Sequence, residues 1–288
     1  MTKKAAVFFL MSAALALAPA SRAAAAAFES LGLGARALGM SDSAVAVSGN
    51  FESVFWNPSG IASLDKKTFQ SEYRDLYGLG LLRYIVSGYA HPGVGRGAVA
   101  VTWYRLDTVG DASTLDYAEN TIAFTYGTYV FDPLFLGATG KYYRVNSTVG
   151  AGGMGFDLGL SYEVSERWLT LGAAVQDTTR TLISWDSGVK DRLPLQVRAG
   201  TSSKIFSKTL LTTQVSWKDE SERSNHAGLE QKLLADALTL RFGGVERDGL
   251  WRFSFGVGLK VRALTMDYGW QRHRYLGDTQ AISLSLGL

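Results

Sequence analysis

The stretch "LWRFSFGVGLKV", residues 250–261, places a large apolar residue at every second position. One face carries Trp251, Phe253, Phe255, Val257, Leu259 and Val261. The other face carries Arg252, Ser254, Gly256, Gly258 and Lys260. Alternation with a period of two indicates a β-strand whose two faces meet different surroundings.

Three further stretches repeat this pattern: "GMGFDLGLSYEV" (153–164), "ALTMDYGWQRH" (263–273) and "AISLSLGL" (281–288). In a soluble β-sandwich the polar faces should be rich in Lys, Glu and Thr, whereas here they are rich in Gly, Ser and Thr. Small polar residues suit a crowded lumen, and large apolar residues suit a surface in contact with lipid. The pattern therefore favours a transmembrane antiparallel β-barrel, with a soluble sandwich as the alternative.

Fourteen such strands can be placed in residues 66–288, and an even number is expected of a bacterial single-chain barrel. They are centred near Gln70, Val86, Val101, Phe124, Ala138, Leu158, Leu171, Val197, Thr213, Gly228, Leu240, Phe255, Tyr268 and Leu284. This leaves roughly 16 residues for each strand with its connection, which accommodates a spanning strand of ~9–11 residues. Short links such as "EVSER" (163–167) alternate with longer ones such as "DTTRTLISWDSGVKDRL" (177–193), as periplasmic turns alternate with outer loops.

Four tryptophans fall at one level in this arrangement. Trp103, Trp217 and Trp270 lie near the ends of strands predicted to run outward, and Trp251 begins a strand predicted to run inward. Tryptophan rings favour the interface between a membrane and water. We therefore expect these four rings to form an aromatic girdle near the outer leaflet.

The N-terminus has the features of a secretory leader. "MTKK" is followed by the apolar run "AAVFFLMSAALALA" and by small residues, which predicts cleavage within Ala23 to Ala27. A membrane anchor is the alternative, but the run is shorter than the roughly 20 residues of a spanning helix. We expect residues 1–27 to direct Sec-dependent export to the outer membrane of a Gram-negative-type bacterium.

Composition excludes several classes of protein. The chain has no Cys, so it has no disulfide framework and no lipid-modified N-terminal Cys. Its formal net charge of +3 includes leader cations, and no block of basic residues indicates binding to nucleic acid. Gly is abundant with 32 residues and Pro is scarce with 5, which fits a chain of many strands.

Residues 28–65 precede the first strand and are too few to bury a core of their own. A barrel of fourteen strands is wider than its own side chains can fill, so it holds either a channel or a plug. The stretches "GARALGM" (34–40) and "VFWNPSG" (54–60) offer glycines for close approach and a turn signal at Asn57-Pro58. We expect this segment to form an N-terminal hatch in the lumen, ahead of a barrel over 66–288.

These two stretches resemble the N-terminal signature of the PorV/PorQ family, within the FadL-like superfamily of outer-membrane β-barrels. The matching residues are Gly34, Ala35, Arg36, Gly39 and Met40 in the first element and Trp56, Asn57, Pro58 and Gly60 in the second. The chain departs from the signature at Ser41-Asp42, where two glycines are common, and at Ser59, where Ala is usual. The resemblance covers about 30 residues, and it implies a fourteen-stranded barrel with a hatch.

The resemblance implies two functions. Length and signature are closest to PorV/PorQ-like proteins, which implies an accessory or interaction barrel in type IX or similar secretion, with secretion proteins or cargo as partners. The alternative is a FadL-like transporter of long-chain fatty acids or other hydrophobic ligands. In either case the barrel is surrounded by outer-membrane lipid.

Charged residues on the predicted inner faces are candidates for a polar lumen rather than for catalysis. They include Asp157, Glu163, Arg198, Arg241, Arg252 and Asp267. We expect most of them to pair with one another and with the hatch, and Arg36 to find its partner among Asp157, Glu163 and Asp267. Ser224, His226 and Asp267 could be combined into a Ser-His-Asp triad, but nothing in the sequence brings them together. The expectation is therefore a protein without catalytic residues, cofactor or metal site.

Overall fold

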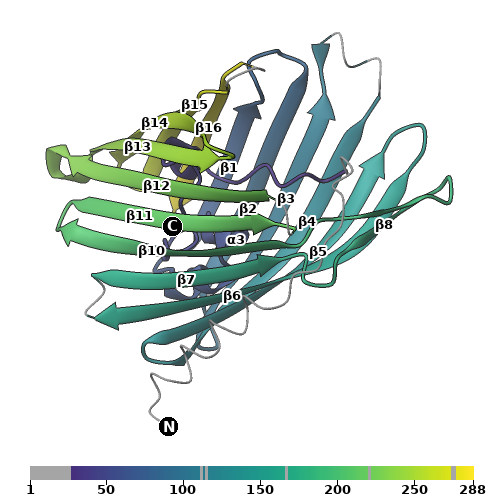
Figure 1. Ribbon diagram of the computed structural model, residues 1–288. Helices are drawn as coiled ribbons and strands as arrows, with labels where there is room; N and C mark the ends of the chain where they lie inside the picture. Colours follow the sequence, from purple (N-terminus) through teal and green to yellow (C-terminus); the bar gives the residue numbers. More distant parts are fainter. Residues whose placement is uncertain (1–26, 111–112, 114–115, 166–167, 220–221, 274–276) are drawn as a thin grey trace.

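The structure is a computed structural model that describes residues 27–110, 113, 116–165, 168–219, 222–273 and 277–288 (Figure 1). The predicted leader up to residue 26 lies outside the described residues, as do parts of four links between strands. No helix in the described part of the chain is long and apolar enough to cross a bilayer.

The described residues form one antiparallel sheet of sixteen strands, fourteen of which close into a ring. The first half of the ring comprises β1 (Thr68–Asp75), β2 (Leu82–Val94), β3 (Gly97–Thr108), β4 (Ala118–Phe131), β5 (Leu134–Asn146), β6 (Ala151–Ser165) and β7 (Leu169–Gln176). The second half comprises β10 (Gln196–Phe206), β11 (Thr209–Lys218), β12 (Glu222–Leu233), β13 (Leu238–Arg247), β14 (Leu250–Val261), β15 (Leu264–Gln271) and β16 (Thr279–Gly287). A short 3-10 turn, η3 (Leu234–Asp236), joins β12 to β13.

The ring is closed by the first and last strands. β1 pairs with β16 along its whole length, from Thr68 opposite Gly287 to Asp75 opposite Gln280. Every other strand of the ring pairs with its neighbour in the chain, except that β7 pairs with β10. The predicted fourteen-stranded barrel is confirmed, since each of the fourteen predicted strand centres lies within one strand of the ring.

The sequence analysis did not predict two short strands. β8 (Leu182–Trp185) and β9 (Lys190–Arg192) form a hairpin inside the stretch 177–193, which was expected to be the longest outer loop. The hairpin adds to the edge of β6 through Ala151 and Gly152. Strands of three and four residues are too short to show a period in the sequence.

The two ends of the barrel differ. We call the end with the short β2–β3, β4–β5, β10–β11, β12–β13 and β14–β15 links the turn end, and the opposite end the loop end. The chain enters the first strand and leaves the last strand at the turn end. By the usual rule for such barrels, the turn end faces the periplasm.

The outer face of the barrel is apolar at most positions. Large side chains there remain exposed, among them Phe124 at 65%, Met154 at 70% and Phe253 at 62%. The neighbouring inward positions carry buried small or polar residues, such as Thr125 and Ser254. A belt of exposed apolar side chains around a closed ring is stable in a bilayer, which makes this a transmembrane barrel.

The assignment of faces can be tested with two arginines. Phe255 points outward on β14, whereas Thr265 on β15 lines a polar cavity in the lumen. Phe255→Arg is expected to reduce folding stability in vesicles by ~2–4 kcal/mol, since arginine is costly near the bilayer midplane. Thr265→Arg is the control. Urea titration of both variants in lipid vesicles should show a smaller loss of folding stability for Thr265→Arg than for Phe255→Arg. Equal losses would mean that the faces are wrongly assigned.

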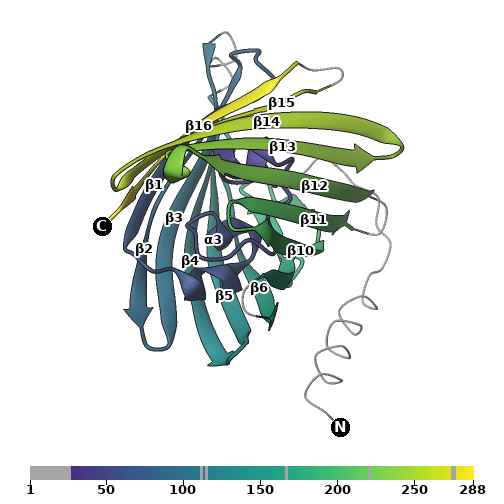
Figure 2. The ribbon, with the colours of Figure 1, turned by 90° about the vertical axis from the view of Figure 1, so that its left-hand side faces the viewer.

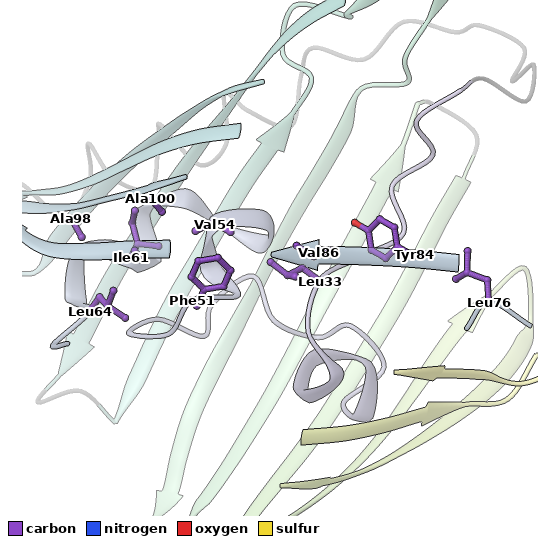
Figure 3. Close-up of a cluster of buried hydrophobic side chains, with 11 residues drawn as sticks. Leu33, Phe51, Val54, Ile61, Leu64, Leu76, Tyr84, Val86, Ala98 and Ala100 are labelled. Atoms are coloured by element: carbon purple, nitrogen blue, oxygen red, sulfur yellow. The ribbon is translucent and has the colours of Figure 1, made fainter. Parts of the chain in front are cut away.

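Residues 28–65, called the inner segment below, fold into three short helices. These are α2 (Ala35–Gly39), α3 (Ser53–Trp56) and the 3-10 helix η1 (Pro58–Ser63). Figure 2 shows α3 enclosed by the strands of the ring. Figure 3 shows Phe51 and Val54 of the inner segment beside Val86 of β2, within a buried apolar cluster. The principal apolar core therefore lies between the inner segment and the wall formed by β2 and β3.

Candidate functional site: the lumen and its inner segment

A belt of glycines on the inner wall lets the inner segment approach the strands. At ten inward-facing glycines of the described chain, an added Cβ would lie within 3.1 Å of an atom of the inner segment. They are Gly88 on β2, Gly127 on β4, Gly137 on β5, Gly159 on β6, Gly172 on β7, Gly200 on β10, Gly228 on β12, Gly243 on β13, Gly256 on β14 and Gly269 on β15. This contact is the reason for the glycine-rich inner faces of the strands.

Many members of the belt are direct partners across neighbouring strands, and in the described chain β1, β3, β11 and β16 contribute none. Gly137 of β5 is directly opposite Gly127 of β4 on one side and Gly159 of β6 on the other. Gly228 is opposite Gly243, and Gly256 is opposite Gly269. Because glycine has no side chain, the backbone of the inner segment packs directly on the backbone of the strands at these pairs.

Asn57 fixes the turn that sits on β5 and β6. Its Nδ2 donates to the carbonyl oxygens of Val45 (2.8 Å) and Leu160 (3.0 Å) and to Ser161 Oγ (3.1 Å). Its Oδ1 accepts from the backbone N–H and the hydroxyl of Ser59. Asn57 is 2% exposed, so all of these bonds form away from solvent, and the amide joins the segment to itself and to the wall.

Trp56 is held by the inner segment itself as well as by the wall. Its Nε1 donates to the carbonyl oxygen of Leu33 at 2.7 Å. The guanidinium of Arg198, from β10, lies 5.1 Å from the Trp56 ring centroid and 5.5 Å from that of Phe55. The indole N–H therefore points back to the backbone of the inner segment itself.

Arg36 pairs with Glu230 of β12 and not with Asp157, Glu163 or Asp267. Its Nε and Nη2 donate to the two carboxylate oxygens of Glu230 at 2.7 and 3.0 Å. Glu230 also accepts from Arg241 at 2.7 Å, and Arg241 donates to Asp267 at 2.7 Å. The result is an alternating network of two guanidinium groups and two carboxylates, in which Glu230 and Arg241 lie between Arg36 and Asp267.

The other predicted lumen charges lie in separate places. Lys141 of β5 pairs with Asp157 at 2.7 Å and with Asp177 at 3.0 Å, near the loop end. Arg198 is buried and donates to Gln196, while one of its terminal nitrogens, Nη1, has no hydrogen-bond partner. The side chains of Glu163 and Arg252 are half-buried.

Sequence reasoning missed a second buried ion pair on β1. Glu72 and Arg74 are both 2% exposed, and their side chains are 2.8 Å apart. Glu72 accepts from the N–H of Gly34, and Arg74 donates to the carbonyl of Leu31. Both residues alternate with the outward Phe69 and Tyr73, so the period of two would have placed them in the lumen.

The four predicted girdle tryptophans lie on the loop-end half of their strands. The rings of Trp103 and Trp251 are exposed, and those of Trp217 and Trp270 are half-buried. Trp103 donates to Asn120 and Trp270 to Asp278, both at 3.2 Å. Their common level at a membrane interface stays a prediction.

Ser224 and His226 of β12 form a hydrogen bond of 2.8 Å, and His226 Nδ1 lies 2.7 Å from the carbonyl oxygen of Ser41. Asp267 is engaged by Arg241 on another part of the wall, so the Ser-His-Asp combination does not come together. Among the described residues, no three acidic or histidine side chains are grouped to hold a metal ion.

Glu52 places an unpaired carboxyl group inside the network. It lies directly against the Cα of Gly34, where an added Cβ would overlap it, and it is 6% exposed. Burial raises the pKa of Glu52 from the ordinary 4.5 to about 8, against the opposing effect of the nearby Arg36 cation. The charges of Asp267, Glu72 and Arg241 also act on it, so at neutral pH the carboxyl group is mostly protonated.

This carboxyl group predicts that docking of the inner segment depends on pH. Docking raises the pKa of this carboxyl group, so the group contributes its full stabilisation of the docked state below its ordinary pKa of 4.5. That stabilisation falls as the pH rises from 4.5, and it is lost above about 8. We expect channel openings in planar bilayers to become more frequent from pH 5 to pH 8 and to level off above. Glu52→Gln should remove this dependence, and an unchanged pH profile in that variant would assign the effect to another group.

Two hollows flank the wall formed by β10 and β11. The outer one, about 640 Å³, lies on the lipid-facing side of β5, β6, β7 and β10 and has an almost wholly apolar lining that includes Leu158, Ala173 and Ala199. The inner one, about 120 Å³, lies in the lumen. Arg198 and Trp217 line both hollows, and the paired backbones of β10 and β11 separate the two.

A third cavity, of about 70 Å³, lies on the loop-end side of the inner segment. Aromatic rings make up much of its lining, and they belong to Phe28, Phe55, Tyr84, Tyr104 and Tyr143. Phe28 packs on Tyr143 with ring centroids 4.8 Å apart. The polar side chains of this cavity include Glu119, which accepts from the N–H of Phe28 at 2.9 Å.

The fold is shared with solved structures of membrane channels. The chain aligns with the toluene transporter TodX of Pseudomonas putida at a TM-score of 0.69 and 11% identity, over 89% of this chain and 99% of TodX. It aligns with the monoaromatic hydrocarbon channel CymD at a TM-score of 0.67 and 12% identity, over 91% of this chain and 99% of CymD. A FadL homologue of Pseudomonas aeruginosa aligns at a TM-score of 0.62 and 13% identity, over 87% of this chain and 97% of the homologue.

The fold and the lumen thus define a fourteen-stranded barrel whose N-terminal segment contacts its inner wall, with the fold of FadL- and TodX-like channels. No family model and no curated protein matches the sequence. The PorV/PorQ resemblance rests on the N-terminal signature alone.

Proposed function

We propose that the protein is an outer-membrane channel that passes small hydrophobic molecules, with the inner segment as its hatch. The observation that carries this proposal is the apolar hollow of about 640 Å³ on the lipid face. A hollow of this size, on a wall otherwise covered by large side chains, suits an apolar solute of moderate size.

The position of the hollow supports a path through the wall. Behind it lie β10 and β11, whose residues Arg198 and Trp217 also line the hollow in the lumen. The small residues Ala173 and Ala199, which pair with each other across β7 and β10, keep the outer side open. An apolar solute in the bilayer would reach the lumen here if the paired strands β10 and β11 part locally, and this path avoids the charged network at the turn end.

The comparisons point the same way. CymD and TodX, whose fold the chain shares, are a monoaromatic hydrocarbon channel and a toluene transporter. For this chain, the predicted leader and the apolar outer face support Sec-dependent export and an outer-membrane location. The proposed function needs no catalytic residue, no cofactor and no metal.

The N-terminal signature supports a second candidate, an accessory barrel in secretion of the PorV/PorQ type. In that case the wall would stay closed, and the loop end would bind a cargo protein. Copurification of a secreted protein with the barrel, together with no solute flux, would favour this function.

A bulky residue in the outer hollow tests the proposed channel. Ala173→Trp fills the hollow, and Ala227→Trp places the same side chain on the outer face of β12, away from it. We expect toluene uptake by proteoliposomes to fall to the level of empty vesicles for the first variant and to stay unchanged for the second. Wild-type uptake no faster than that of empty vesicles would reject transport of this solute class.

A further inference from the structure

The turn-end mouth of the lumen carries a group of cations that the proposed function does not use. Its members are Lys66, Lys204, Lys208, Lys232, Lys260 and Arg262, and all six are exposed. They line two adjoining cavities of about 400 and 330 Å³, which share Arg36, Gly49, Glu230 and Lys232. We call these six residues the basic arc.

The basic arc occupies one continuous part of the mouth. Lys204 and Lys208 belong to the end of β10 and the β10–β11 turn, Lys232 to the end of β12, and Lys260 to the end of β14. These strands lie in the continuous run from β10 through β16 to β1, separated by β11, β13, β15 and β16. The cations therefore follow half of the mouth and do not converge on one point, so a single small anion cannot contact them all.

Three of these lysines face the lumen, not the lipid. Lys204 is two residues beyond Ser202, whose hydroxyl donates to the carbonyl of Ala46 in the inner segment. Lys232 is two residues beyond Glu230, the partner of Arg36. Residues two apart in a strand share a face, so these side chains, like Lys260 beyond Gly258, point into the mouth.

The cations of the basic arc have no acidic partner within ion-pair distance in the described part of the chain. At the loop end several cations are paired, such as Arg83 with Asp107 (2.7 Å) and Lys218 with Glu29 (2.9 Å). The acids of the mouth, Glu230 and Asp267, are already bound by Arg36 and Arg241. The other acids that line these cavities are fewer than the six cations, and they are Glu52, Glu163, Asp65 and Asp236.

We propose that the turn-end mouth docks an acidic peptide segment of a partner protein. An extended acidic segment can contact several cations along the arc at once, and its backbone fits the cavities between them. Anionic lipid headgroups are the other polyanionic surface available, but they would meet cations on the outer side of the strands, whereas Lys204, Lys232 and Lys260 point inward. The proposal does not rest on what the barrel conducts.

The test uses the mature barrel in nanodiscs of zwitterionic lipid and a fluorescein-labelled peptide of alternating Glu and Ser. Binding is followed by fluorescence anisotropy at low and high salt. The variant Lys204→Glu/Lys208→Glu/Lys232→Glu is expected to weaken binding by about tenfold or more, since it replaces three attractions by repulsions. Wild-type binding should also weaken with salt.

The control variant makes the same charge change at the other end: Lys190→Glu/Arg192→Glu/Arg223→Glu. It should bind the peptide as the wild type does, and heat-modifiability shows that each variant is folded. Equal losses in both variants would overturn the proposal, because net charge would then explain binding. No binding by the wild type, with flotation on phosphatidylglycerol vesicles that depends on the basic arc, would overturn it in favour of lipid.

Discussion

Removal of residues 28–65 is expected to convert the barrel into an open pore with a strongly raised single-channel conductance. The fourteen strands satisfy their backbone hydrogen bonds among themselves, so the ring should still form. The lumen would be left with inward glycines and small polar residues, which cannot fill a ring of this width. Planar-bilayer recording measures the conductance, and heat-modifiability reports folding.

Point variants of the hatch should give a weaker version of this result. Arg36→Ala leaves Glu230 with one cation, and Asn57→Ala removes the amide that joins Val45 to Leu160. Both should produce short, fluctuating openings. A deleted form that inserts with unchanged conductance would show that other residues block the lumen. Failure to insert would make the segment part of the folding core.

Gly137→Val is expected to undock the inner segment and to give conductance close to that of the deletion. A Cβ at this position would lie 2.2 Å from the carbonyl carbon of Pro58 and from the N of Ser59. These are backbone atoms on the glycine belt, held by the hydrogen bonds of Asn57 and Ser59, so they cannot move aside singly. Overpacking of a well-packed site usually costs ~1–3 kcal/mol, and a clash with fixed backbone lies at the upper end.

Gly140→Val is the matched control, three residues along the same strand but on the outer face. A Cβ there meets only the Phe156 ring at 3.6 Å, an ordinary contact. It should fold and block current as the wild type does. If both valines raise conductance equally, β5 is sensitive to any side chain, and the belt has no special role in docking.

The barrel itself was predictable because its pattern is repeated in every strand. Each strand must separate lipid from lumen, so "LWRFSFGVGLKV" and its relatives carry the period of two over enough residues to be read. The proposed hatch was inferred by exclusion, since a wide ring needs a filling, and its role stays a prediction. Its three short helices were not foreseen, because "SVFW" and "PSGIAS" carry no helical period and are shaped by the wall around them.

Pairing across the chain was the least predictable feature. Arg36 binds Glu230, which is 194 residues away, and nothing near either residue signals the other. The inward face of Glu230 could have been read from Gly228 two residues earlier, but its choice over Asp267 depends on how β12 lies relative to α2. The β8–β9 hairpin was missed for a similar reason, since its edge pairing with β6 is set by the closed ring.

The glycine belt also imposes an order of assembly. The inner segment rests on strands from β2 to β15, and the ring is sealed by β16 pairing with β1, which directly follows that segment. The inner segment is therefore expected to dock on the curved sheet before the ring closes. After closure, it could enter the lumen only through one of the two ends of the barrel. Pairing of β16 with β1 then encloses a segment that is already in place. A chain truncated before β16 would therefore lose the bound inner segment as well as the closure of the ring.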